Sequence, residues 1–357
     1  MIAKKRVLVC PLNWGLGHAS RDVPIIKALL DSNFEVLMAG EGESIALFKK
    51  EFPHLERVRL PGYSVRYSRH SSQIVKMLFL APRIILESIK EHRYVKQLVN
   101  KHCIDIIISD NRFGVWSTKT YNIFITHQLK VKFPGVLGVF DTVYQLLFNK
   151  LVKAYNECWI PDYSGESNLS GELSHGEIKL KNIHFVGPLS RFKNNKPEKQ
   201  DYTIDILFIL SGPEPQRSLF EEIIQNQGSK SNYNLSLVRG TIRKRKHDFD
   251  FPVYDMLAGD ELEKLIKSSR LVICRSGYSS VMDLAVLQKK AVLVPTPGQT
   301  EQEYLAVYLK NKGLFYSVKQ KNFDLNQAIK SAFDFPTGTV DLEVMIREKI
   351  ESLKKIV

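Results

Sequence analysis

The sequence predicts an α/β protein in two halves, each built on a sheet of parallel strands. Short apolar runs of strand length alternate with stretches of helical periodicity, as they do in βαβ units. Glycine-rich or polar turns follow several of these runs directly, which is typical of ligand-binding loops at the carboxyl ends of parallel strands. The length of 357 residues also fits two domains. We therefore expect two Rossmann-like halves that face each other across a cleft.

The first half is expected to span residues 1–191, and the polar stretch 192–202 is expected to link it to the second half. Its strands are predicted from apolar runs and its first helix from apolar residues at helical spacing. The predicted strands are Arg6–Cys10, Phe34–Ala39, Ile104–Ser109, Asn122–Thr126, Cys158–Pro161 and His184–Val186, and the first helix is Asp22–Leu30.

The second half is expected to span residues 203–338. Its predicted strands are Ile204–Leu210, Asn234–Val238, Leu271–Cys274 and Ala291–Val294, and its predicted helices are Ser218–Gln225, Asp260–Ser268, one after Gly277 and one that starts near Thr300. A charged amphipathic helix is predicted for residues 339–357, and we expect it to return to the first half.

The stretch Leu271–Tyr304 carries the strongest indication of a binding site. Ser276-Gly277 follows a buried strand and precedes a helix, so the backbone there can approach a pyrophosphate whose charge the helix N-terminus stabilises. Asp283 and Glu303 each stand fourth in a capping-box spacing. Each carboxylate is therefore predicted to cap its helix, to accept hydrogen bonds from ribose hydroxyls, or to do both.

A glycine-rich turn containing a histidine follows the first strand. The turn differs from the dinucleotide fingerprint because the third glycine is absent and His18 follows Gly17 directly. We expect this loop to direct the His18 side chain into the cleft. Asp110 and His127 each follow a later strand and are expected to face the same cleft, although Asp110 is equally suited to cap the next turn.

The net charge of +13 calls for an anionic partner or a solvated basic face. No zinc finger, RNA-recognition motif or arginine-rich tail is present, so we expect no nucleic-acid partner. Two stretches, 57–101 and 130–153, combine basic with apolar residues and predict contact with an anionic membrane surface. The alternative for both stretches is a core helix with a basic solvent-facing side.

The cysteines and the apolar runs predict a cytoplasmic protein. Four scattered cysteines form no Cys-x-x-Cys pair and no metal-ligand spacing, as is usual in a reducing compartment. The apolar run after the basic start is too short for a secretory signal. No segment reaches the roughly 18 apolar residues that a membrane-spanning helix needs.

Four stretches of this chain resemble the GT-B glycosyltransferases, specifically the family 28 type, which includes a transferase that acts on a lipid intermediate of peptidoglycan. The four stretches are GLGHASR (Gly15–Arg21), VGPLSR (Val186–Arg191), ICRSGYSSVMDLA (Ile273–Ala285) and VPTPGQTEQEYLA (Val294–Ala306). The resemblance covers nearly the full length and is most specific in the second half. There the glycine of RSG is followed six positions later by an acidic residue, and QTEQE follows in turn.

The resemblance implies that the second half binds a UDP-sugar. The implied donor-binding residues are Gly17, Arg191, Ser211, Gly212, Arg275, Ser276, Gly277, Ser279, Ser280, Asp283, Gln302 and Glu303. Backbone N–H groups of residues 276–280 would hold the diphosphate, Asp283 the ribose, and Gln302 and Glu303 the sugar ring. The backbone near Tyr254–Leu257 would contact the base. Pro213 and Pro215 depart from the small residues usual in the loop that contains Ser211 and Gly212.

The resemblance also implies an inverting transfer in which an acceptor hydroxyl attacks the anomeric carbon and UDP leaves. His18 is the predicted base, with Asp110 as its orienting partner or its rival, and His127 lies on the acceptor side. Helix N-termini and Arg191 or Arg275 would stabilise the leaving diphosphate, and neither a metal nor a cofactor is expected. The expected acceptor is a lipid-linked or cell-envelope glycan. The alternatives are a UDP-sugar 2-epimerase or hydrolase on the same fold, and a non-catalytic nucleotide-sugar-binding subunit.

Overall fold

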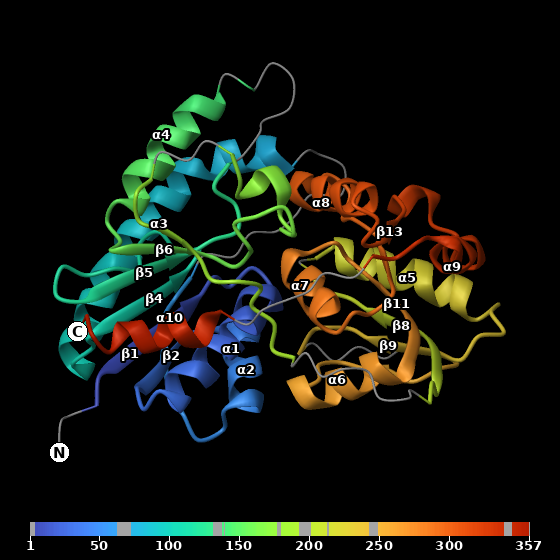
Figure 1. Cartoon of the computed structure of the whole chain (residues 1–357), viewed down its shortest axis with the longest axis horizontal. Coiled ribbons are helices and arrows are strands. Elements are labelled where there is room, and N and C mark those ends of the chain that lie inside the picture. Colours follow the sequence, from blue (N-terminus) through green and yellow to red (C-terminus); the bar gives the residue numbers. More distant parts are fainter. Residues whose placement is uncertain are drawn as a thin grey trace.

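The protein consists of two α/β units, each built around one parallel sheet (Figure 1). The structure is a computed structural model of the whole chain, and it describes residues 4–62, 73–130, 138, 140–176, 180–192, 201–212, 214–242, 249–338 and 345–356. Several predicted features lie wholly or partly outside these residues: most of the linker 192–202, Pro213, the start of the helix predicted at 339–357, and parts of the two apolar and basic stretches.

The first sheet has seven strands in the order β3-β2-β1-β4-β5-β6-β7, all of them parallel. Its strands are β1 (Arg6–Pro11), β2 (Glu35–Gly40), β3 (Glu56–Arg59), β4 (Ile106–Asp110), β5 (Tyr121–Ile125), β6 (Glu157–Ile160) and β7 (Ile183–Phe185). Its helices are α1 (Leu16–Asp31), α2 (Gly42–Glu51), α3 (Gln73–His102) and α4 (Phe140–Val152), with a short 3₁₀ helix, η2, at Gly171–Leu173.

The second sheet has six parallel strands in the order β10-β9-β8-β11-β12-β13. Its strands are β8 (Ile204–Ile209), β9 (Leu235–Val238), β10 (Val253–Tyr254), β11 (Ser269–Cys274), β12 (Ala291–Leu293) and β13 (Tyr316–Ser317). Its helices are α5 (Gln216–Gly228), α6 (Gly259–Ser268), α7 (Tyr278–Val286), α8 (Thr300–Asn311) and α9 (Leu325–Asp334), with a short 3₁₀ helix, η3, at Gln320–Asn322; helix α10 (Ile346–Leu353) ends the chain.

Both sheets follow the doubly wound order in which the chain starts at a central strand, builds outward to one edge and then returns to the other side. The order reverses between β1 and β4 in the first sheet and between β8 and β11 in the second. Ligands of such sheets bind at this reversal, outside the carboxyl ends of the two central strands. The loops after β1, β4, β8 and β11 are therefore the places where the topology favours a site.

One predicted helix start and one predicted helix cap are wrong. Helix α1 begins at Leu16 and not at Asp22, because Gly15 makes the tight turn out of the strand with a φ of 107°. His18 therefore lies in the first helical turn. Helix α7 begins at Tyr278 with Gly277 as its N-cap, so Asp283 lies well inside the helix and the predicted capping box of Ser280 and Asp283 does not form.

The C-terminal helix returns to the first unit, as predicted, and lies across it beside α1 (Figure 1). The Ser32 hydroxyl at the end of α1 donates to Glu351 over 2.5 Å, and Lys349 of α10 pairs with Glu157 of β6 at 2.8 Å. The buried residues Ile346, Ile350 and Leu353 provide the apolar face of α10. None of the helices in the described ranges is long and apolar enough to cross a membrane.

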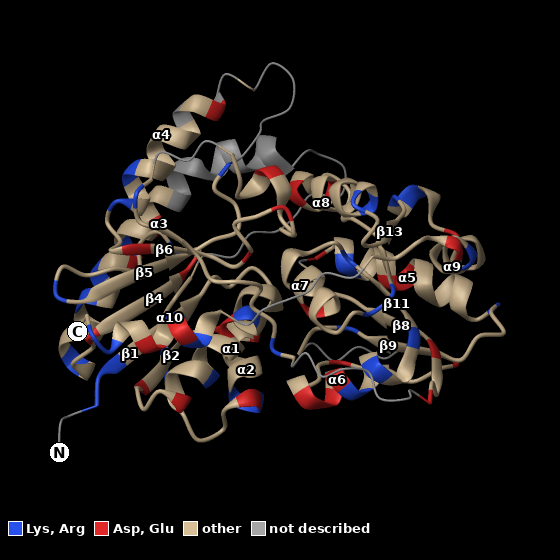
Figure 2. Cartoon of the chain, in the orientation of Figure 1, with Lys and Arg blue, Asp and Glu red and all other residues tan. Residues whose placement is uncertain are grey.

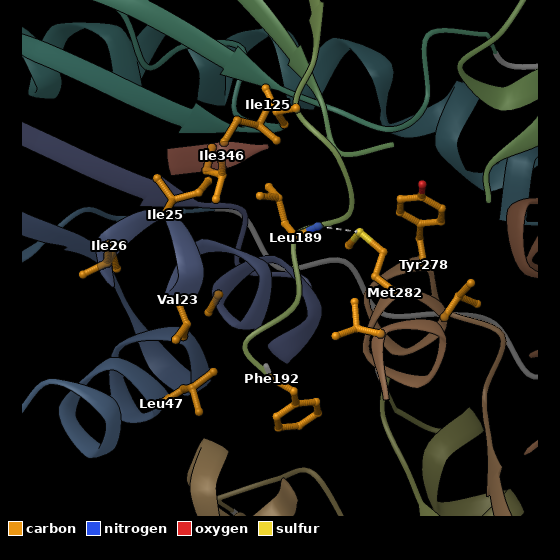
Figure 3. Close-up of a cluster of buried hydrophobic side chains, with 14 of the residues drawn as sticks. Val23, Ile25, Ile26, Leu47, Ile125, Leu189, Phe192, Tyr278, Met282 and Ile346 are labelled. Carbon is orange, nitrogen blue, oxygen red and sulfur yellow. Dashed lines mark hydrogen bonds between the residues drawn. The ribbon is translucent and has the colours of Figure 1, made fainter. Parts of the chain in front are cut away.

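A continuous buried core joins the two units. Residues of α1, such as Val23 and Ile26, belong to the same hydrophobic cluster as Tyr278 and Met282 of α7 (Figure 3). The Leu189 N–H, in the segment between the units, lies 3.2 Å from the Met282 sulfur. Helix α1 follows β1 at the reversal point of the first sheet, and α7 follows β11 at the reversal point of the second sheet. Because α1 packs against α7, the two reversal points lie close together.

Candidate active site

His18 and Asp110 meet at the reversal point of the first sheet. The Nδ1 atom of His18 lies 2.9 Å from Oδ1 of Asp110, which is the last residue of β4. The Asp110 carboxylate also accepts two hydrogen bonds from Arg21, one of them from Nε to Oδ2 at 2.7 Å. Arg21 follows His18 by three residues on α1, so both side chains reach the same side of the helix. Asp110 and Arg21 are both almost completely buried.

The hydrogen bonds of Asp110 favour one tautomer of His18. Arg21 Nη2 lies 3.0 Å from His18 Nδ1, but the same nitrogen already donates to Asp110 at closer range. When Nδ1–H donates to the carboxylate, Nε2 is left as the acceptor that a general base requires. Burial, the largest cause, lowers the pKa of His18, and the charge of Arg21 lowers it further, while Asp110 opposes both. His18 is therefore unprotonated near neutral pH.

Asp110 is held as a carboxylate, whereas burial and the charge of Asp110 shift its neighbour Asp22 toward the neutral acid. Burial disfavours the charged form of Asp110, but Arg21 and His18 overcome it and lower its pKa to about 2. Asp22 is fully buried and neither of its oxygens has a hydrogen-bond partner among the described residues. Burial and the charge of Asp110 raise the pKa of Asp22 well above its usual value. Asp110 is therefore a charged aspartate that faces the histidine.

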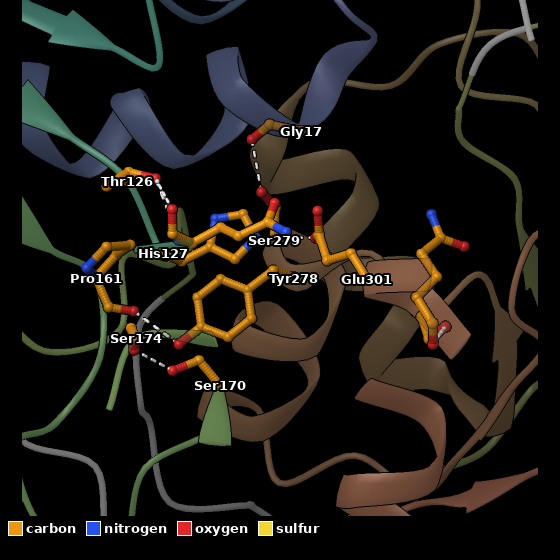
Figure 4. Close-up of polar contacts among 12 residues, drawn as sticks. Gly17, Thr126, His127, Pro161, Ser170, Ser174, Tyr278, Ser279 and Glu301 are labelled. Carbon is orange, nitrogen blue, oxygen red and sulfur yellow. Dashed lines mark hydrogen bonds and ion pairs between the residues drawn. The ribbon is translucent and has the colours of Figure 1, made fainter. Parts of the chain in front are cut away.

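His127 extends this cluster toward the second unit (Figure 4). Its Nδ1 lies 2.9 Å from Arg21 Nη1, and because guanidinium groups only donate, Nδ1 is the acceptor. Its Nε2–H then donates to Oε1 of Glu301, in the first turn of α8, at 2.9 Å. The His127 ring stacks on Tyr278 of α7, with ring centroids 4.4 Å apart and planes within 5°. His127, predicted on the acceptor side, thus joins both units.

The glycine loops of the two units face each other at this point. The Ser279 hydroxyl donates to the carbonyl oxygen of Gly17 over 2.7 Å, one residue before His18 (Figure 4). A Cβ atom built on Gly15 would lie 3.9 Å from the Cα atom of Gly212, which itself has a φ of 90°. The loop after β1 is therefore next to the loops after β8 and β11. Neither α1 nor α7 has a side-chain cap, so their first N–H groups point toward this meeting point.

Asp283 and Arg191 lie together where the chain passes from the first unit to the second. The Ser190 hydroxyl donates to Oδ1 of Asp283 at 2.6 Å, and Arg191 Nε lies 3.5 Å from Oδ2. Burial raises the pKa of Asp283, and Arg191 and Ser190 oppose that shift. A ribose bound to Asp283 would share or replace these bonds. The ribose role stays a prediction.

Arg275 does not take the position that the sequence suggested. Its guanidinium is 1% exposed and donates to the carbonyl oxygens of Gln216, Val294 and Pro295. It also lies over the Phe220 ring, 4.4 Å from the centroid. These contacts tie together the segments after β8, β11 and β12 inside the second unit. This burial argues against a direct contact between Arg275 and a leaving diphosphate.

The remaining predicted donor residues also support the loops. The Ser276 hydroxyl donates to the Gln302 carbonyl, and the Gln302 side chain accepts from the Thr296 N–H at 2.9 Å. Glu303 is exposed, and its carboxylate accepts from the Gly298 N–H at 3.0 Å. Glu303 therefore binds the backbone of the loop before α8 and not the Thr300 N–H of the predicted capping box. Gly277 and Ser280 lie at the start of α7, and Ser211 follows β8. Whether any of them contacts a sugar stays a prediction.

Two functional candidates were not predicted from the sequence. Arg21 belongs to the GLGHASR stretch, and its spacing of three from His18 on a helix would have shown that the two side chains share a face. Glu301 gave no such signal, because its partner His127 is 174 residues away in the other unit. The described residues contain no group of three or more His, Cys, Asp or Glu side chains placed to hold a metal ion.

Comparison with known proteins connects this arrangement to one family. Residues 206–356 match the glycosyltransferase family 28 C-terminal domain. A UDP-N-acetylglucosamine–N-acetylmuramyl-(pentapeptide) pyrophosphoryl-undecaprenol N-acetylglucosamine transferase from Buchnera aphidicola is 22% identical in an alignment 342 residues long, which covers 91% of this chain and 88% of that protein. The enzyme of the same name from Clostridium tetani is 24% identical in an alignment 296 residues long, which covers 78% of this chain and 75% of that protein. This chain is a glycosyltransferase, and its residues 206–356 belong to the family 28 C-terminal domain.

Solved structures confirm the predicted GT-B fold of this glycosyltransferase. The crystal structure of Acinetobacter baumannii MurG covers 98% of this chain and 99% of its own, with a TM-score of 0.55 and 12% identity. The superposition on the glycosyltransferase SnogD from Streptomyces nogalater covers 99% of this chain and 100% of SnogD, with a TM-score of 0.64 and 12% identity. The predicted enzyme class, a glycosyltransferase, is also confirmed by these comparisons taken together.

Proposed function

We propose that this glycosyltransferase moves a sugar, an N-acetylhexosamine or a hexose, from a UDP-sugar to a hydroxyl of a lipid-linked or cell-envelope glycan, with inversion at the anomeric carbon. The observation that carries the proposal is the His18–Asp110 pair at the point where the glycine loops of both units meet. The relatives from Buchnera aphidicola and Clostridium tetani are named for a UDP-sugar donor and an undecaprenol-linked acceptor.

His18 has the properties of the base in this reaction. Its Nδ1–H is oriented by Asp110, its Nε2 is left to accept a proton, and its lowered pKa keeps it unprotonated near neutral pH. The acceptor oxygen bonds to the anomeric carbon while its proton moves to Nε2, and the bond from that carbon to the diphosphate oxygen breaks. The electron pair of that bond leaves with UDP. A base placed in this way contributes roughly 10²–10⁴-fold to the rate.

The donor diphosphate is proposed to lie between the N-termini of α1 and α7. Both helices begin at a reversal point of their sheet and have no side-chain cap, so their first N–H groups are suited to an anion. Arg191 and Asp283 lie on one side of the proposed diphosphate position, where the chain passes from the first unit to the second. No metal or cofactor is proposed, because N–H groups and a guanidinium can stabilise the charge of departing UDP.

The acceptor side is proposed to rest on an anionic membrane surface, at the cytoplasmic face. Helices α3 and α4 pack against the same segment, Phe113–Trp116, through the His92–Trp116 and Phe148–Phe113 ring contacts. Large apolar side chains on these two helices are exposed, namely Ile85, Leu86, Ile89, Leu146, Leu147 and Leu151. Exposed Lys and Arg side chains accompany them, namely Lys90, Arg93, Lys96, Lys150 and Lys153. Figure 2 shows blue Lys and Arg positions along the ribbon in this part of the first unit. Apolar residues with basic neighbours favour binding to an anionic lipid surface.

Thermal-shift screening of nucleotide sugars tests the donor class. A ligand present at 100 times its Kd stabilises the folded state by about 2.7 kcal/mol, which raises Tm measurably in a protein of this size. We expect a rise with UDP and UDP-sugars and none with ADP- or GDP-sugars at the same concentrations. An equal rise with all three nucleotides, or a rise with GDP-sugars alone, would refute the proposed donor.

Liposome co-sedimentation tests the membrane surface. Leu146→Asp combined with Leu147→Asp should abolish co-sedimentation with anionic vesicles at low salt, whereas Val307→Asp should not. Val307 is a matched control because its side chain is similarly exposed and lies on α8 of the second unit, not on α3 or α4. Wild-type protein that stays in the supernatant with anionic vesicles would contradict the membrane proposal.

A further inference from the structure

The polar cluster around His18 contains one member from the second unit. His18 and Arg21 come from α1, Asp110 ends β4 and His127 follows β5, so these four belong to the first unit. Glu301 comes from α8 of the second unit and contacts the cluster only through His127 Nε2, at 2.9 Å. The cluster is complete only when the two units are closed against each other.

The formal charges show what Glu301 adds. Arg21 is a cation and Asp110 an anion, and because they are hydrogen bonded to each other their charges cancel. His127 accepts from Arg21 and donates to Glu301, so it is neutral. Burial and the charge of Asp110 raise the pKa of Asp22, which favours its neutral form, and Asp22 is counted as neutral. Glu301 then gives the cluster a net charge of −1 before His18 takes a proton and a net charge of zero afterwards.

We propose that Glu301 is a positioning residue that joins the candidate base to the closed arrangement of the two units, fixing His127 and Arg21 and supplying the negative charge that balances protonated His18. This inference rests on the proposed role of His18 as the base. The proton that the base receives comes from the acceptor hydroxyl, and the electron pair of the broken bond leaves on UDP. A buried imidazolium needs a compensating charge, and Asp110 is already shared with Arg21.

The groups that surround His18 and Glu301 are consistent with this role. His18 is faced by Arg21 of α1, by Asp110 of β4 and by His127 after β5, and Glu301 of α8 lies beyond His127. Asp22 of α1 faces Asp110 and Arg21. Burial opposes the ionisation of Glu301, but His127, His18 and Arg21 together lower its pKa, so it is a carboxylate. If His18 stabilises charged Glu301, then Glu301 stabilises charged His18 by the same coupling free energy.

An NMR titration of the His18 imidazole tests the inference without any substrate, so it is independent of the proposed donor and acceptor. Glu301→Gln removes the charge and keeps an oxygen to accept from His127. We expect the pKa of His18 to fall by about one unit relative to wild type, the lower end of the range for a nearby charge because His127 lies between. Glu301→Asp, which keeps the charge, should titrate within a few tenths of a unit of wild type.

Glu43→Gln is the matched control, because Glu43 also accepts a hydrogen bond across the interface, from Thr241 at 2.9 Å, without contacting the cluster. This variant should leave the His18 titration unchanged. A second readout is the dependence of kcat on pH, where sugar transfer is measurable. In Glu301→Gln the acid limb of this profile should move to lower pH and kcat should fall about tenfold. The donor KM should stay within about twofold of wild type. An identical His18 titration in wild type and Glu301→Gln, or an equal shift in Glu43→Gln, would overturn the inference.

Discussion

Replacing Asp110 with asparagine keeps the shape of the side chain and removes its charge from the centre of the candidate active site. The carboxylate oxygens accept from His18 on one side and from Arg21 on the other. An asparagine presents an N–H₂ group to one of these two donors, so one of the bonds is lost. If the bond to His18 is lost, Nδ1 becomes the unprotonated nitrogen and Nε2 cannot accept a proton. We therefore expect kcat to fall by about 10²–10⁴-fold, with the donor KM little changed.

The same variant has a calculable effect on stability. The pKa of Asp110 is about 2 in the folded chain, against 3.8 for an unperturbed aspartate. At 1.36 kcal/mol per unit this difference corresponds to about 2 kcal/mol of folding free energy near neutral pH. Because the pKa is depressed, this contribution is fully present above about pH 4 and disappears as the pH falls through about 2. The difference in unfolding free energy between the variant and wild type should therefore become smaller as the pH falls from about 4 to about 2.

Urea unfolding at pH 7 and at pH 3, together with steady-state kinetics, measures both effects. The account expects a lower unfolding free energy for Asp110→Asn at pH 7 and a smaller difference at pH 3. A variant that unfolds like wild type at both pH values would refute the charge argument. A stable variant whose kcat stays within about threefold of wild type would refute the role of Asp110 in orienting His18.

Three further substitutions separate the roles of the other residues. His18→Ala should lower kcat by about 10²–10⁴-fold while UDP binding, measured by calorimetry, stays within about threefold of wild type; unchanged turnover would exclude His18 as the base. Asp283→Ala should weaken UDP binding about tenfold, because a charged hydrogen-bond acceptor is lost, and an unchanged Kd would refute the ribose assignment. Arg275→Lys should cost about 1–3 kcal/mol of stability through its carbonyl contacts but leave the UDP Kd unchanged, and a large loss of UDP affinity in a stable variant would restore the predicted contact with the donor.

The sequence was sufficient to predict the fold and which loops meet between the two units. Strand-length apolar runs followed by Gly15, Asp110 and Ser276 predicted which loops meet, because parallel strands present their carboxyl ends at one edge. The return of α10 to the first unit was also predicted. The helix starts were less accurate, since Gly15 ends its turn in a conformation that lets α1 begin at Leu16.

Apart from the His18–Asp110 pair, which the family resemblance suggested, side-chain partners between distant segments could not be predicted. Arg275 and Asp110 both follow buried strands, yet Arg275 turns into its own unit to satisfy loop carbonyls while Asp110 faces the cleft. Local sequence does not distinguish these outcomes, because each depends on which unpaired groups lie nearby in the folded chain. Glu301 illustrates the same limit. Its role depends on His127 of the other unit, and only closure of the units brings them together.

The central claim is that this enzyme passes a sugar from a UDP-sugar to an acceptor hydroxyl with His18 as the base. The direct measurement is UDP release and product analysis with UDP-N-acetylglucosamine, with and without membranes that contain lipid-linked glycan, for wild type and His18→Ala. The account predicts UDP release only when acceptor is present, label on the acceptor, and a loss of at least about 100-fold in His18→Ala. Free sugar or the 2-epimer formed in step with UDP release, without acceptor, would contradict it.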